Sequence, residues 1–283
     1  AIKLAAQQDL TIVHPFSDPD VIAGQGTIAV ELLEQSSGVP DAVFVPIGGG
    51  GLIAGIGSYI KHHHPEIKII GVEPVDCASM HESFRAGEVV TLDHIGTFAD
   101  GAAVKRVSEE TFRVALEVVD HIVLVNTDEI CAAIKDVFED SRVILEPAGA
   151  LAVAGLKRYV ETEGCRDQTL VTLNCGANMN FDRLRHVSER AELGEHREAL
   201  IAVELPERPG AFLEFCGTIG ARNITEFNYR YAAGDTARVF AGIGLSSGRK
   251  EAETLISALE AKGYPVLDLT DNELAKLHVR HMV

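Results

Sequence analysis

Short apolar segments alternate with amphipathic segments over the first 174 residues. The apolar segments are almost continuously rich in valine, isoleucine and leucine, and they read TIVHPF, AVFVPI, KIIGVEP, HIVLV and LVTLNCG. Segments between them, such as residues 28–33, repeat their apolar positions at a helical spacing. Apolar strands separated by helices are typical of a parallel sheet that is buried on both faces. The pattern predicts an α/β domain built on an open parallel sheet.

A different pattern follows a polar, charged segment that lies between about Arg190 and Glu198. Beyond it, the apolar segments ALIAVEL, ITEFNYRY, TARVFAGIGL and YPVLDL alternate with two helical segments, residues 212–219 and 249–262. The order strand, helix, strand, strand, helix, strand is that of an α+β ferredoxin-like fold. We therefore predict two domains, residues 1–196 and residues 197–283.

The composition narrows the choice of partners. A chain of 283 residues with 46% hydrophobic composition is large enough for two cores. Its formal charge of -17 and pI near 5.0 disfavour nucleic acid and anionic membrane surfaces as partners. No apolar run approaches the roughly 20 residues of a membrane span, and the first residues do not resemble a secretion signal. Five scattered cysteines suggest reduced thiols, and we expect a cytoplasmic protein.

A glycine-rich loop is the strongest chemical signal. The strand AVFVPI ends in Gly48, Gly49, Gly50 and Gly51, and Leu52 then opens a helix. Without Cβ atoms, successive backbone N–H groups can converge on an anion, and a helix N-terminus adds about half a positive charge. The spacing fits neither the dinucleotide fingerprint nor a Walker loop, so a monophosphate is the better ligand. The alternative is a tight strand-to-helix turn that binds nothing.

A second candidate follows the strand LVTLNCG. Cys175 ends this strand, and ligands of open α/β sheets bind at the carboxyl edge where such residues lie. A neutral thiol there could donate a weak hydrogen bond to a ring nitrogen. The alternative is a cysteine that packs as a small hydrophobic residue in the core.

Several motifs together carry a family resemblance: IAGQGT, VFVPIGGGGLIAG, GVEP, EPAGALA and NCGANMNFDRLRHVSERAELGE. The chain resembles the threonine dehydratase family of fold type II pyridoxal-phosphate enzymes over essentially its whole length. The glycine loop alone is shared by many fold type II enzymes. The last motif, which leads into a regulatory domain, resembles the biosynthetic, allosteric branch.

The resemblance implies a cofactor, a reaction and a site. Pyridoxal 5'-phosphate would be bound by Gly48, Gly49, Gly50, Gly51 and Leu52, with Cys175 as the partner of the pyridine nitrogen. Glu146 would lie near the ring edge, although a solvated helix-cap carboxylate is an equal alternative. The implied reaction is the deamination of L-threonine to 2-oxobutanoate and ammonia, with L-serine as a possible substrate. A homotetramer or homodimer is implied as well.

Two expected features of the family are missing. The Schiff-base lysine of the family lies in a segment similar to F-K-x-R-G-A, and no lysine of this chain has that context. We therefore expect the chain to be catalytically incomplete, and a non-catalytic amino-acid-binding regulatory module is an alternative. A cation site of related racemases would use Glu73 and an aspartate where this chain has Ser79, so we expect no metal. The run His62, His63 and His64 is more typical of a solvated helix end.

The C-terminal domain contains LPERPGAF, which resembles the strand-to-helix turn of ACT-like domains. The resemblance implies that Pro209, Gly210, Ala211 and Phe212 bind an effector, isoleucine or in some members valine, with ITEFNYRY as an adjacent strand. A domain that only mediates dimer contacts is the alternative.

Overall fold

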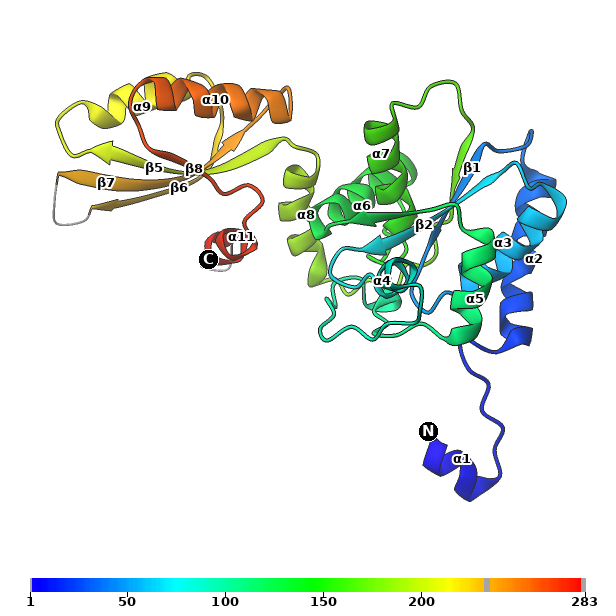
Figure 1. The fold of residues 1–283 in the computed structure, drawn as a ribbon. Helices are drawn as coiled ribbons and strands as arrows, with labels where there is room; N and C mark the ends of the chain where they lie inside the picture. Colours follow the sequence, from blue (N-terminus) through cyan, green and yellow to red (C-terminus); the bar gives the residue numbers. More distant parts are fainter. Residues whose placement is uncertain (1, 232–234, 281–283) are drawn as a thin grey trace. The chain divides into compact units, whose positions relative to one another are not determined.

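The computed structural model describes residues 2–231 and 235–280, and the chain divides into two compact units (Figure 1). The first unit comprises residues 1–181 and the second comprises residues 182–283. α8 (Arg183–Gly194) is part of the second unit because it packs against β5 (Glu198–Pro206). This division falls before the predicted boundary near residue 196, and the domain limits stay a prediction. None of the described helices is long and apolar enough to span a bilayer.

The first unit is built on a four-stranded parallel sheet, as predicted. Its strand order is β3-β2-β1-β4. The strands are β1 (Ala42–Pro46), β2 (Lys68–Pro74), β3 (His121–Val125) and β4 (Leu170–Thr172). Because β1 and β4 are parallel neighbours, their carboxyl ends meet at the same edge of the sheet.

Helices cover both faces of this sheet (Figure 1). The helices of this unit are α1 (Ile2–Gln8), which lies apart from the sheet in Figure 1, α2 (Pro19–Gln35), α3 (Gly51–His63), α4 (Ser79–Ala86), the short 3-10 helix η1 (Asp100–Ala102), α5 (Glu109–Val118), α6 (Thr127–Ser141) and α7 (Leu151–Glu163). Val43 and Val45 of β1 join a core cluster with the isoleucines of α3. Phe44 between them packs against Tyr159 of α7, with ring centroids 5.3 Å apart. Both faces of β1 are therefore buried, which explains its unbroken apolar sequence.

The helix starts of the first unit differ in how they are capped. α5 and α6 each begin with a capping box, formed by Ser108 with Thr111 and by Asn126 with Glu129. α3 begins after Gly50, which has φ +90° and gives no side-chain cap. The first N–H groups of α3 therefore have no side-chain acceptor, unlike those of α5 and α6.

One predicted strand is absent. Residues 11–16, TIVHPF, form no strand, although their apolar sequence resembles that of the other strands. Ile12 is 48% exposed and Val13 is 63% exposed. A strand is stable only when a neighbour satisfies its backbone groups, and this segment pairs with no strand of the described sheet. Residues 28–33, predicted as a helix, lie inside the longer α2.

The second unit has the predicted ferredoxin-like order. After β5 come α9 (Ala211–Ile219), β6 (Ile224–Tyr231), β7 (Thr236–Gly244), α10 (Arg249–Ala261), β8 (Val266–Asp268) and finally α11 (Glu273–Arg280). The antiparallel sheet has the order β6-β7-β5-β8, and α9 and α10 lie along one of its faces (Figure 1). The alternate residues Ile201, Val203 and Leu205 of β5 face these helices and form the core with them.

The strand ITEFNYRY is not adjacent to the strand that carries the LPERPGAF turn. β6 pairs with β7, and β7 pairs with β5, so one strand lies between them. The expected neighbourhood in the sheet was wrong because hairpin-connected strands pair with each other first in this fold. β6 is instead an edge strand, and most of its residues are exposed.

Candidate functional site

The four glycines lie between β1 and α3 at the carboxyl edge of the parallel sheet. Ile47 extends β1 by donating its N–H to the carbonyl of Val72, at 2.9 Å. Gly50 then adopts φ +90°, a left-handed conformation that favours glycine, and α3 starts at Gly51. The side chain of Leu52 packs against the core cluster beneath the sheet. The loop is thus fixed at both ends, and the uncapped start of α3 lies at the carboxyl edge of the sheet.

Each of the four glycines has a close neighbour where a side chain would begin. An added Cβ at Gly48 would lie 3.1 Å from Cα of Ala102, and one at Gly50 would lie 2.7 Å from Cε of Met80. Added Cβ atoms at Gly49 and Gly51 would lie 2.1 Å and 2.7 Å from atoms of Phe16. Packing alone therefore explains why all four residues are glycines. The case for an anion rests on the uncapped N–H groups of α3, which suit a phosphate monoester.

Cys175 lies on the loop that follows β4, and Glu146, from the segment between α6 and α7, lies close to this loop. Leu173 donates its N–H to the carbonyl of Phe44 at 3.1 Å, which keeps this loop beside the end of β1. The carboxylate of Glu146 accepts the N–H of Asn178 at 3.2 Å, and an added Cβ at Gly176 would lie 2.4 Å from this carboxylate. Glu146 does not cap α7, since Ala150 is the N-cap and no side chain caps it. Its carboxylate is therefore directed at the loop that carries Cys175.

The 3-10 helix η1 connects the two parts of the edge. Gly101 faces Glu146, because an added Cβ would lie 3.3 Å from its carboxylate oxygen. The next residue, Ala102, packs against Gly48 of the glycine loop. The structure thus gathers the predicted cofactor residues along the ends of β1 and β4, with η1 between them. Neither Phe16 nor η1 is predicted there from the sequence.

The thiol of Cys175 is held in its neutral form. Cys175 is exposed, yet desolvation by its surroundings and the negative charge of Glu146 raise its thiol pKa to about 11. A neutral thiol can donate a hydrogen bond, whereas a thiolate can only accept one. Cys175 is therefore suited to face a ring nitrogen that carries no proton.

This thiol pKa leads to a test of the arrangement. At pH 7.5 roughly one thiol in 3,000 would be ionised, so iodoacetamide should alkylate exposed Cys175 slowly, with a rate that still rises above pH 9. The Glu146→Gln substitution removes the neighbouring charge and should speed alkylation at a given pH. Peptide mass spectrometry against time measures both rates. A rate for Cys175 that levels off near pH 8.5, or is unchanged by Glu146→Gln, would contradict the arrangement.

Four lysines are bonded to other groups or lie at the far end of an element from the glycine loop. Lys61 is in the last turn of α3, about 15 Å along the helix axis from the loop, and its Nζ lies 2.7 Å from the carboxylate of Asp120. Lys68 begins β2 at the opposite edge of the sheet. Lys105 donates to the carbonyl of Asp93 at 2.9 Å, and Lys157 pairs with Asp136. The amines of Lys61, Lys105 and Lys157 are thus bonded to groups other than the glycine loop.

Glu73 has a structural role. It is fully buried, and its carboxylate oxygens accept the N–H groups of Met80 at 2.9 Å and His81 at 2.8 Å, at the start of α4. Burial raises its pKa to about 7.

His64, in the run of three histidines, pairs with Glu66 at 3.1 Å. Among the described residues no group of three or more histidine, cysteine, aspartate or glutamate side chains could hold a metal ion.

The predicted effector turn lies in the second unit, between β5 and α9. Gly210 has φ +90° and is the N-cap of α9 without a side-chain cap, so the first N–H groups of α9 also lack a side-chain acceptor. Ala211 is buried, whereas Phe212 is 45% exposed and contacts the rings of Phe227 and Tyr229 on β6. Pro209 is exposed. An uncapped helix start therefore lies next to an exposed aromatic cluster.

The fold and the site define a class of enzyme. A family profile described as pyridoxal-phosphate dependent enzyme matches residues 1–176. A second profile, described as the C-terminal regulatory domain of threonine dehydratase, matches residues 189–279. The chain belongs to the family of pyridoxal-phosphate dependent enzymes, whose cofactor is pyridoxal phosphate.

Within this class the chain is similar to threonine dehydratases. It is 54% identical over 283 residues to a biosynthetic L-threonine dehydratase of Burkholderia multivorans, covering 100% of this chain and 56% of the relative. It is 50% identical over 295 residues to a mitochondrial threonine dehydratase of Saccharomyces cerevisiae, covering 99% and 51%. The solved structure of processed threonine deaminase isoform 2 from Solanum lycopersicum matches with a TM-score of 0.66 at 46% identity, covering 68% of this chain and 55% of that chain. The chain spans about half the length of the curated relatives that it matches.

Proposed function

We propose that this chain is the phosphate-binding part of the catalytic domain, with a regulatory domain, of a biosynthetic L-threonine dehydratase. The whole enzyme would convert L-threonine to 2-oxobutanoate and ammonia by β-elimination of water, the first step of isoleucine biosynthesis. The observation that carries this proposal is the uncapped start of α3, which lies beside Cys175 at one edge of the parallel sheet. The names of the similar proteins support the choice of threonine.

Each site residue has a proposed role. Gly48, Gly49, Gly50, Gly51 and Leu52 bind the phosphate through backbone N–H groups, while the side chain of Leu52 anchors the loop in the core. When bound, pyridoxal phosphate supplies an electron sink for breaking the Cα–H bond of the substrate. Cys175 donates a weak hydrogen bond to the ring nitrogen without giving up its proton, which keeps that sink mild. Glu146 lies at the ring edge and holds the Cys175 loop in place through Asn178.

We also propose that the Schiff-base lysine is not among these 283 residues. The positions of Lys61, Lys68, Lys105 and Lys157 support this. The same observation favours a second candidate, a non-catalytic module that binds amino acids. The two candidates differ in whether the site binds a cofactor at all.

The spectrum of the chain with added pyridoxal phosphate distinguishes them. We expect reversible, phosphate-dependent binding and no borohydride-stable adduct at a lysine of the site. A longer polypeptide of the relatives' length should then release 2-oxobutanoate from L-threonine faster than pyruvate from L-serine. No cofactor binding would favour the non-catalytic module, faster turnover of serine would favour an L-serine dehydratase, and a stable adduct with turnover would show that another lysine does the chemistry.

Assembly and location remain proposals. A homotetramer or homodimer is expected from the family resemblance, and sedimentation of the chain tests it. The cytoplasmic location predicted from the sequence stays a proposal, and the relative from Saccharomyces cerevisiae is named mitochondrial.

The second unit is proposed to sense isoleucine, or valine. The uncapped N–H groups of α9, next to Gly210, suit the carboxylate of a small amino acid, and the exposed rings of Phe212 and Phe227 suit its apolar side chain. The match of residues 189–279 to the regulatory domain of threonine dehydratase supports effector binding over a purely structural role.

A substitution at Gly210 tests this role. No atom lies within 4 Å of an added Cβ, so Gly210→Val would act through its φ of +90°, where a β-branched residue costs about 1 to 3 kcal/mol. We expect the turn to rearrange and isoleucine affinity, measured by calorimetry, to fall about tenfold or more. Gly217→Ala is the matched control, because it lies in the same helix and also has no atom within 4 Å of an added Cβ. Equal isoleucine affinities in the unsubstituted chain and the two variants would show that the effector does not bind at this turn.

A further inference from the structure

Thr111 links the first turn of α5 to the glycine loop. Its side chain is fully buried, and its Oγ1 donates a hydrogen bond to the carbonyl oxygen of Gly49 at 2.8 Å. The two residues are 62 positions apart in the chain. No other side chain is described as bonding to a backbone group of the four glycines. This contact therefore connects α5 directly to the loop that we propose binds phosphate.

The capping box by itself does not require Thr111 to donate its hydroxyl proton. In the capping box, Oγ1 of Thr111 accepts the N–H of Ser108 at 3.2 Å, and the N–H of Thr111 is accepted by Ser108 at 3.1 Å. The hydroxyl proton then has three possible acceptors, Oγ of Ser108 at 3.0 Å, the carbonyl of Ser108 at 3.2 Å and the carbonyl of Gly49, which is the nearest at 2.8 Å. A capping box usually has glutamate or glutamine at this position, as α6 has Glu129. An ionised glutamate caps equally well but has no proton to donate, so threonine adds the bond to Gly49.

This bond determines the orientation of one peptide group. In a planar trans peptide the C=O and the next N–H point in opposite directions. With the Gly49 carbonyl turned toward Thr111, the N–H of Gly50 must point away from α5. Gly50 itself lies close to α5, since an added Cβ there would lie 3.0 Å from Cβ of Thr111.

We infer that Thr111 is a positioning residue for the glycine loop, whose hydroxyl fixes the Gly49–Gly50 peptide so that the Gly50 N–H is presented to the phosphate of the cofactor. The inference rests on the proposed function, because it takes the loop to be a phosphate site. Thr111 contacts the loop and not the ligand, so it acts through the loop backbone.

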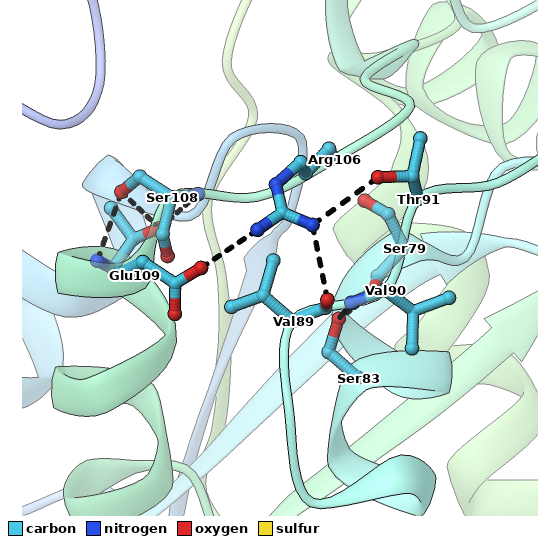
Figure 2. A network of polar contacts seen from close by, with 9 residues as sticks. Ser79, Ser83, Val89, Val90, Thr91, Arg106, Ser108 and Glu109 are labelled. Atoms are coloured by element: carbon cyan, nitrogen blue, oxygen red, sulfur yellow. Dashed lines mark hydrogen bonds and ion pairs between the residues drawn. The ribbon is translucent and has the colours of Figure 1, made fainter.

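The start of α5 is itself fixed by a network of polar contacts, which Figure 2 shows around Arg106. Arg106 donates to the carbonyl of Val89 at 3.1 Å, to Oγ1 of Thr91 at 3.2 Å and to Glu109 at 2.7 Å. These contacts connect the segment after α4 to Glu109, the first residue of α5, which directly follows Ser108 and lies two positions before Thr111. The network therefore holds the helix start from which Thr111 reaches the loop.

The affinity ratio of pyridoxal phosphate to pyridoxal tests the inference. Pyridoxal lacks the phosphate, so this ratio reports on the loop alone, and equilibrium dialysis of the full 283-residue chain measures both affinities. Thr111→Val removes the hydroxyl at nearly constant volume, and we expect the ratio to fall about tenfold, the effect of one backbone hydrogen bond. Thr111→Ser keeps the hydroxyl and should stay within about twofold of the original ratio.

Ser108→Ala is the matched control for stability. It weakens the same helix cap but leaves the bond from Thr111 to Gly49. We expect it to lower the melting temperature and to preserve the ratio. An unchanged ratio in Thr111→Val, or an equal fall in Ser108→Ala, would overturn the positioning role. If the unsubstituted chain itself binds pyridoxal phosphate no better than pyridoxal, the phosphate site fails, and the proposed function fails with it.

Discussion

Replacing Gly49 with aspartate should abolish binding of pyridoxal phosphate by the chain. The new Cβ would lie 2.1 Å from the ring of Phe16, so the ring must move, and a carboxylate would enter a site that we propose binds an anion. Loss of two charge-assisted hydrogen bonds, at about 1.5 to 3 kcal/mol each, would weaken binding by about 100-fold or more. Equilibrium dialysis measures the affinity, and circular dichroism shows whether the chain stays folded.

The control separates the effect of the charge from the effect of crowding. In a Phe16→Ala background the ring is gone, so Gly49→Ala can be accommodated, and it should bind the cofactor within about tenfold of Phe16→Ala alone. Gly49→Asp in the same background should still bind poorly, because the charge remains. A folded Gly49→Asp variant that keeps its cofactor would show that the phosphate binds elsewhere.

The pH dependence of stability should reveal the burial of Glu73. Burial raises the pKa of this carboxyl to about 7, above its ordinary value of 4.5. Between these two values the folded state binds the proton more tightly than the unfolded state, so stability falls as the pH rises from about 4.5 to 7 and is level above that. The expected loss in the free energy of unfolding is up to about 3 kcal/mol.

Glu73→Gln is the variant that isolates this contribution. A glutamine stays neutral at every pH, so the variant should lack this part of the slope, although its amide can accept only one of the N–H groups of Met80 and His81. Hydrogen exchange followed by mass spectrometry in urea resolves the unfolding of the first unit from that of the second. Parallel pH profiles for the two proteins would mean that Glu73 ionises normally in the folded chain.

The sequence predicts the parts of the site that lie at the ends of regular strands. The strand leading to Gly48 and the strand leading to Cys175 were recognisable from their apolar residues, and parallel strands bring their carboxyl ends together. The order of elements in the second unit followed from its alternating apolar pattern in the same way. The family profiles and relatives confirm the fold class and the cofactor.

Long-range contacts of irregular segments could not be predicted. Phe16 belongs to a segment that the sequence predicts as a strand, and Gly101 to one with no helical or strand period, so no pattern places either residue at the glycine loop. Residues 11–16 were wrongly predicted as a strand because an apolar run does not reveal whether a partner strand exists. Thr111 looked like any polar residue near a helix start, and only the absence of the usual glutamate at its capping position was a signal.

The pairing of β1 with β4 has a consequence for how the protein folds. It joins residues as far as 128 positions apart, such as Asp41 and Thr169. Closing so long a loop has an entropic cost that comes before any contact is gained, so this edge of the sheet should form late. A nascent chain would contain the complete glycine loop for many seconds before Cys175 leaves the ribosome. Cofactor capture is then a late event, and pyridoxal phosphate would slow the unfolding of the finished domain more than it speeds its folding.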